Sequence, residues 1–93
     1  IFTTTELAYA KDNATTLAGN FAVKEAVSKV FGTGFFGVEP YEIEVLRNES
    51  GAPYVKLYGK AKEIAKDKQV SRIHVSITNT REFAQAFAIG ECV

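Results

Sequence analysis

Methionine and tryptophan are absent from this chain of 93 residues, and cysteine and histidine each occur once. Because Cys92 has no partner in the chain, no internal disulfide can form, and nothing indicates an oxidising compartment. One cysteine and one histidine are also too few for a four-ligand zinc site. No apolar run reaches the length of a transmembrane helix and no signal peptide is visible, so we expect a cytoplasmic protein that does not bind membranes.

Net charge is also lacking, since 11 basic side chains are balanced by 11 acidic ones. A nucleic-acid-binding domain needs a basic excess, so we do not expect a nucleic-acid partner. A hydrophobic fraction of 46%, without repeats or long linkers, predicts one globular domain over residues 1–93. A chain of this length buries a modest core, which contact with neighbouring subunits would enlarge.

The pattern of apolar residues predicts three helices and four strands. Helices are expected over residues 4–11, 16–31 and 60–68, and strands over residues 41–47, 53–58, 72–78 and 83–89. Thr3 and Glu6 have the spacing of a capping box before the first helix. In the last strand, Ala84, Ala86 and Ala88 form a face small enough for a helix or another strand to approach closely. The order of elements predicts an α+β fold, in which a largely antiparallel sheet packs against a long central helix.

The predicted central helix carries one charged stripe on an otherwise apolar surface. Glu25 and Lys29 are four residues apart, so both project from one side of the helix, in line with the small Ala18 and Ala22. One interpretation is an exposed ion pair that contributes roughly a few tenths of a kcal/mol. The other is a ligand-binding pair, and helix geometry alone does not decide between the two.

The ligand-binding interpretation depends on the turn that follows the helix, at Gly32, Thr33 and Gly34. Together with Lys29, this turn would supply an ammonium group, a hydroxyl and unhindered backbone N–H groups, a combination that suits a phosphate. Glu25 would then hold a Mg²⁺ ion bound to the same phosphate, because Mg²⁺ usually takes only one or two carboxylates from a protein. The spacing differs from that of a Walker P-loop.

A specific resemblance joins these residues. Phe21, Lys24, Glu25, Ala26 and Lys29 follow the pattern Phe-x-x-Lys-Glu-Ala-x-x-Lys, and a Gly-x-Gly motif comes shortly after it. This pattern resembles that of the holo-[acyl-carrier-protein] synthases, the short bacterial type of 4'-phosphopantetheinyl transferase. The similarity runs in order along nearly all of the chain and includes Phe2, Thr3, Glu6, Leu7, Ala8, Tyr9, Ile43, Glu44, Val45, Gly51, Ala52, Pro53, His74, Val75, Ser76 and Ile77.

The resemblance implies a 4'-phosphopantetheinyl transferase fold and a Mg²⁺-dependent reaction of fatty acid biosynthesis. A serine of apo acyl carrier protein would attack the β-phosphorus of coenzyme A, take the 4'-phosphopantetheine group and release 3',5'-ADP. Glu25 matches the metal-binding glutamate and Lys29 the lysine that contacts the phosphates, so these are the expected catalytic residues. The residues expected to contact coenzyme A are Lys24, in a lesser role, and Gly32, Thr33, Gly34, Asn79 and Thr80. The family also implies a homotrimer with active sites between subunits.

Three features differ from the family pattern. The family's N-terminal strand, whose Gly-x-Asp motif carries the second metal ligand, and the helix after it have no counterpart in residues 1–93. Asn20 stands where the family usually has an arginine, and Asn79 stands where it often has a histidine. A second hypothesis is therefore a non-catalytic module of the same fold that oligomerises or binds coenzyme A.

Overall fold

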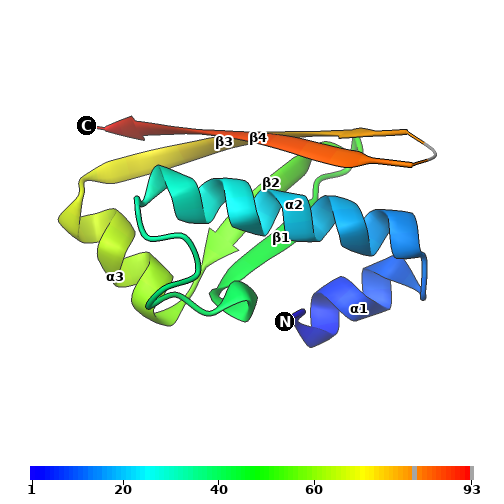
Figure 1. Cartoon of the computed structure of the whole chain (residues 1–93), viewed down its shortest axis with the longest axis horizontal. Helices are drawn as coiled ribbons and strands as arrows, with labels where there is room; N and C mark the ends of the chain where they lie inside the picture. The colour runs from blue at the N-terminus through cyan, green and yellow to red at the C-terminus, as the bar shows by residue number, and fades with distance from the viewer. Residues whose placement is uncertain (81, 93) are drawn as a thin grey trace.

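The computed structural model describes residues 1–80 and 82–92, so Arg81, in the predicted turn before the last strand, lies outside the described residues. The helices are α1 (Thr4–Ala10), α2 (Ala14–Val30), the 3-10 helix η1 (Pro40–Glu42) and α3 (Gly59–Asp67). The strands are β1 (Ile43–Arg47), β2 (Pro53–Leu57), β3 (Val70–Asn79) and β4 (Ala84–Cys92). In Figure 1, α2 lies along the β3–β4 hairpin, with the β1–β2 hairpin behind it and α1 beside its N-terminal end. The predicted α+β fold is confirmed.

Local capping fixes where the first two helices begin. The Thr3 hydroxyl accepts from Glu6 N at 3.1 Å and the Glu6 carboxylate accepts from Thr3 N at 2.8 Å, which is the predicted capping box. The Asn13 side chain accepts from Thr16 N at 3.1 Å, so α2 begins two residues earlier than predicted. No helix within the described ranges has the length and apolar character to cross a membrane.

The described strands form two antiparallel hairpins. Strand β1 pairs with β2, with Val45 opposite Val55, and β3 pairs with β4, with Val75 opposite Ala88. The predicted antiparallel pairing is confirmed, although β2 packs beside β3 without a hydrogen-bonded ladder, so that two sheets form in place of one. The first strand starts at Ile43 and not at residue 41, because η1 occupies the preceding residues.

Strand β4 packs closely on α2 through small residues. Its inward face consists of Ala84, Ala86, Ala88 and Gly90, and these alternate with exposed side chains, as predicted for the alanines. A Cβ added at Gly90 would lie 2.7 Å from Val30 Cγ1, so the helix and strand approach as closely as a glycine allows. The buried core beneath α2 is formed by Val23, Val27, Phe31, Val38, Ile43, Val45, Ala61 and Ala65.

Candidate functional site

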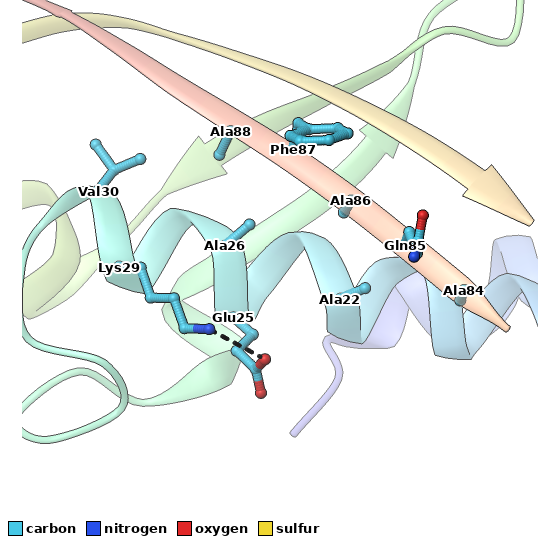
Figure 2. Close-up of a pocket in the computed structure, with 10 residues that line it drawn as sticks. All are labelled: Ala22, Glu25, Ala26, Lys29, Val30, Ala84, Gln85, Ala86, Phe87 and Ala88. Atoms are coloured by element: carbon cyan, nitrogen blue, oxygen red, sulfur yellow. Dashed lines mark ion pairs between the residues drawn. The ribbon is translucent and has the colours of Figure 1, made fainter.

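Glu25 and Lys29 form the expected ion pair on the surface of α2. Their side chains are 54% and 73% exposed, and Glu25 Oε1 lies 3.7 Å from Lys29 Nζ. Figure 2 shows both side chains reaching to the same side of the helix. An exposed pair of this kind contributes at most about 1 kcal/mol to the free energy of folding. Each side chain can therefore leave the other and bind a ligand with little loss of stability.

The pair borders an open groove between α2 and β4 (Figure 2). The groove has a volume of about 640 Å³, within the range of small-molecule sites. It is lined by Ala22, Glu25, Ala26, Lys29 and Val30 of α2 and by Ala84, Gln85, Ala86, Phe87 and Ala88 of β4. Most of these side chains are small, so the two charged groups are the main source of chemical specificity on this wall.

A divalent cation would find one carboxylate here. Within residues 1–80 and 82–92 no group of three or more His, Cys, Asp or Glu side chains is arranged to hold a metal. Mg²⁺ commonly takes only one or two protein carboxylates and completes its octahedron with waters and substrate phosphates. The Glu25 carboxylate therefore fits a Mg²⁺ ion that arrives with a phosphate ligand, and does not make a metal site alone.

The glycine turn after α2 does not offer the free amides that the sequence predicted. Gly32 N donates to Lys29 O at 2.9 Å, and the amides of Thr33 and Gly34 both donate to Ser28 O at 3.2 Å. The Thr33 hydroxyl donates to Gly34 O at 2.7 Å. These bonds close the C-terminal end of α2, and the positive φ angles of Gly32 (77°) and Gly34 (57°) permit the turn. The prediction of unhindered N–H groups is therefore wrong, because all three amides are already hydrogen-bonded.

Lys24 is buried and does not line the groove. Its ammonium donates to Glu6 Oε1 at 2.9 Å, to Pro40 O at 2.9 Å and to Ile43 O at 2.6 Å. An ammonium has three protons, so no donor of Lys24 remains for a ligand. The structure thus contradicts a direct contact of Lys24 with coenzyme A and places this lysine in the core.

The buried lysine belongs to a polar network with two carboxylates. Burial lowers the pKa of Lys24 below its ordinary 10.5, while the hydrogen bond and charge of Glu6 and the charge of Glu44 act in the opposite direction. Glu44 accepts from the Thr3 hydroxyl at 2.6 Å and from the Tyr58 hydroxyl at 2.9 Å. The bond from Tyr58 raises the pKa of that phenol. The network ties the N-terminal end of the chain to β1.

Asn79 and Thr80 lie near the other end of α2 from the glycine turn. A Cβ added at Gly19 would be 3.5 Å from Asn79 Oδ1, so the asparagine side chain lies over the N-terminal half of the helix. The Thr80 hydroxyl accepts from Phe83 N at 3.0 Å in the turn before β4. At a rise of 1.5 Å per residue, Gly19 and Val30 are separated by about 16 Å along the helix axis. One chain therefore does not gather all the predicted ligand residues in one place.

Arg47 was not expected to take part in the site, because no sequence motif includes it. Its guanidinium donates to Asn20 Oδ1 at 2.8 Å and lies over the Tyr9 ring, 5.5 Å from the centroid. Asn20 is only 1% exposed, and its Nδ2 has no hydrogen-bond partner among the described residues. Arg47 of β1 thus brings a guanidinium to the position of Asn20 on α2.

The fold and the groove first define a class of protein. This is a small α+β domain in which one long helix presents an exposed carboxylate and ammonium beside an alanine-faced strand. The profile of the 4'-phosphopantetheinyl transferase superfamily matches residues 1–90. The chain belongs to this family.

Individual relatives agree with the family match. A holo-[acyl-carrier-protein] synthase of Lachnoclostridium phytofermentans is 62% identical over 76 residues, or 82% of this chain and 62% of the relative. One of Halothermothrix orenii is 43% identical over 94 residues, or 98% of this chain and 75% of the relative. The chain thus spans less than two thirds of the first relative's length and three quarters of the second's.

Solved structures of holo-[acyl-carrier-protein] synthases share the fold. The Helicobacter pylori protein in complex with coenzyme A superposes with a TM-score of 0.87 at 26% identity, over 97% of this chain and 76% of that one. The Mycobacterium tuberculosis protein superposes with a TM-score of 0.80 at 36% identity, over 99% of this chain and 81% of that one. The predicted 4'-phosphopantetheinyl transferase fold is therefore confirmed.

Proposed function

We propose that this protein is a holo-[acyl-carrier-protein] synthase. It transfers 4'-phosphopantetheine from coenzyme A to a serine of apo acyl carrier protein, with Mg²⁺, and releases 3',5'-ADP. The observation that carries the proposal is the exposed Glu25–Lys29 pair on the wall of the groove between α2 and β4. Relatives that are 62% and 43% identical bear the name of this activity, which supports the assignment.

The proposed roles follow from the charges of the pair. Lys29 binds the phosphates of coenzyme A and stabilises negative charge as the 3',5'-ADP leaves. Glu25, released from Lys29 by the incoming phosphates, is the carboxylate that would hold Mg²⁺. When bound, the ion would supply positive charge at the diphosphate that is being cleaved. Because both side chains are exposed, breaking their ion pair costs only about 0–1 kcal/mol of interaction free energy.

We further propose that the complete site forms between subunits of a homotrimer. Within one chain, Asn79 and Thr80 lie near the end of α2 opposite to the glycine turn. In the proposed trimer, Asn79 and Thr80 of one subunit approach Lys29 of the next. The amides of the glycine turn keep their hydrogen bonds to the helix end, so this turn shapes the site without binding phosphate through its N–H groups.

An exposed apolar surface supports the oligomer. On the outer face of the β3–β4 hairpin, Phe87 is 71% exposed and Ile89 is 64% exposed, and small Ser76 lies opposite Phe87 in register. Large exposed apolar side chains on one face commonly mark a protein contact. Covering them with a second copy would also enlarge the small core of the domain.

A transfer assay tests the proposed function directly. The full-length protein is mixed with coenzyme A, Mg²⁺ and apo acyl carrier protein, and the carrier is weighed by mass spectrometry. We expect the carrier to gain one phosphopantetheine group, and we expect this gain to be about 10³-fold slower with Glu25→Gln. A carrier that stays unmodified with the wild-type protein would contradict the proposal.

The second candidate is a module that binds coenzyme A or oligomerises without turnover. The burial of Asn20 favours it, because this position offers no exposed charge to a phosphate. Calorimetric titration with coenzyme A separates the two candidates. Binding that requires Mg²⁺ and is lost in Glu25→Gln supports the enzyme, whereas binding without metal supports the module. In both cases we place the protein in the cytoplasm, where an exposed thiol such as Cys92 stays reduced.

A further inference from the structure

Lys24 and Glu6 form a buried ion pair one residue from Glu25. Both side chains are 0% exposed, and the nitrogen and oxygen are 2.9 Å apart. Removing two charges from water is costly, and a buried pair is favourable only where further hydrogen bonds satisfy its remaining oxygens and protons. Lys24 uses all three of its protons, and both oxygens of Glu6 accept hydrogen bonds. Every charged atom of the buried pair therefore has a hydrogen-bond partner.

The pair joins four segments of the fold. Lys24 on α2 donates to the carbonyl of Pro40, the first residue of η1, and to that of Ile43, the first residue of β1. Glu6 on α1 accepts from Val45 N of β1 at 3.1 Å through its second oxygen. Helices α1 and α2, the turn η1 and the strand β1 thus meet at one ammonium group.

The direction of Lys24 sets the direction of Glu25. Successive residues of an α-helix are turned by about 100°, so anchoring Lys24 toward η1 fixes Glu25 on the neighbouring side, which borders the groove. Rotation of α2 would break the buried bonds of Lys24, and unpaired buried polar groups carry a large desolvation penalty. Because η1 follows the loop that starts at the glycine turn, the same ammonium also anchors the far end of that loop.

We propose that Lys24 is a positioning residue, which holds α2 in the rotation that places Glu25 on the wall of the groove. The inference rests on the proposed function, since it requires Glu25 to bind Mg²⁺ together with coenzyme A. Lys24 contacts neither ligand and acts through the helix.

The test measures coenzyme A binding by the full-length protein over a series of Mg²⁺ concentrations, by calorimetry. The double variant Glu6→Gln/Lys24→Met removes both buried charges together and keeps side chains of similar length. We expect its Mg²⁺ half-saturation to rise by about tenfold or more, as is common when a residue that orients a metal ligand is lost. Its circular dichroism and its affinity for coenzyme A without Mg²⁺ should stay at the wild-type values. Lys62→Met, which removes an exposed lysine of α3, is the matched control and should change nothing.

The outcomes separate the two proposals. If wild-type binding does not depend on Mg²⁺, the proposed function fails. If it does, and the folded double variant keeps the wild-type half-saturation, the positioning role of Lys24 is overturned while the proposed function stands. Should the double variant not fold, the same titration on Glu6→Gln decides. The expected rise is about threefold, because the amide can satisfy fewer of the carboxylate's hydrogen bonds, and an unchanged value overturns the inference.

Discussion

Two lysines of α2 form ion pairs with glutamates in opposite environments, Lys24 with Glu6 of α1 and Lys29 with Glu25 of α2. Lys24 and Glu6 are 0% exposed and 2.9 Å apart, whereas Lys29 and Glu25 are 73% and 54% exposed and 3.7 Å apart. In the buried pair, the three ammonium protons and both carboxylate oxygens form hydrogen bonds within the chain. In the exposed pair, both side chains are accessible to other partners. The same residue types therefore stabilise the fold on one side of the helix and stay open to a ligand on the other. Burial distinguishes the two roles, and residue type does not.

Within the exposed pair, substitution of Glu25 is expected to have the largest effect on activity. Glu25→Gln is expected to lower the rate of carrier modification by about 10³-fold, because a neutral amide is a poor ligand for Mg²⁺. Its melting temperature should shift by no more than about 2 °C, since an exposed pair contributes little to stability. Mass spectrometry of the carrier and thermal denaturation measure the two effects. Glu63→Gln, at an exposed glutamate of α3, is the control, and near wild-type turnover in Glu25→Gln would contradict the assignment.

The buried pair should show the reverse pattern when it is broken at Lys24. Lys24→Met leaves the Glu6 carboxylate buried without its cation, so the free energy of unfolding should fall by about 3–5 kcal/mol. Lys29→Met should change it by less than about 1 kcal/mol. Urea denaturation of both variants measures the difference. Equal losses of unfolding free energy in Lys24→Met and Lys29→Met would contradict the claim that only the buried pair stabilises the fold.

The exposed lysine is expected to act on ligand binding. Lys29→Met should weaken coenzyme A binding about tenfold, because a charge-assisted bond to phosphate is lost. Added salt should weaken binding by the wild type more than by the variant, since exposed charges are screened. Calorimetric titrations at low and high salt measure both effects, and an unchanged affinity in Lys29→Met would place the phosphates elsewhere.

A last expected effect concerns how closely β4 approaches the groove side of α2. Gly90→Ala places a methyl group 2.7 Å from Val30 Cγ1, and we expect a loss of about 1–3 kcal/mol of unfolding free energy. Gly19→Ala meets Ile77 Cγ2 at 3.1 Å and should cost less. Urea denaturation ranks the two, and a larger loss at Gly19 would show that the helix can move away from β4 at its C-terminal end.

The sequence predicted the elements well where the signals are local. Thr3, Glu6 and Asn13 cap helices through neighbours three residues away, so their spacing was visible in the chain. The alternation of small residues in β4 likewise predicted a face open to close packing by a helix or a strand, and the structure places α2 there. The stretch before β1 was missed because η1 is held by a lysine 16 residues away from Pro40, which no local pattern reveals.

The candidate site was only partly visible in the sequence. The pairing of Glu25 with Lys29 follows from helix geometry, and the structure confirms it. The burial of Lys24 depends on Glu6, 18 residues earlier, and this distant partner could not be inferred from spacing. The glycine turn is predicted to bind phosphate because the sequence does not show whether its amides are already hydrogen-bonded. Only the fold shows that Ser28 O and Lys29 O accept hydrogen bonds from these amides.

Glu25 and Lys29 are proposed to leave each other for a metal ion and a diphosphate. A crystal structure of the full-length protein with coenzyme A and Mg²⁺ tests this most directly. We expect Mg²⁺ at about 2.1 Å from a Glu25 oxygen and a phosphate oxygen at about 2.8 Å from Lys29 Nζ. A diphosphate bound elsewhere, with the two side chains still paired and facing solvent, would contradict it.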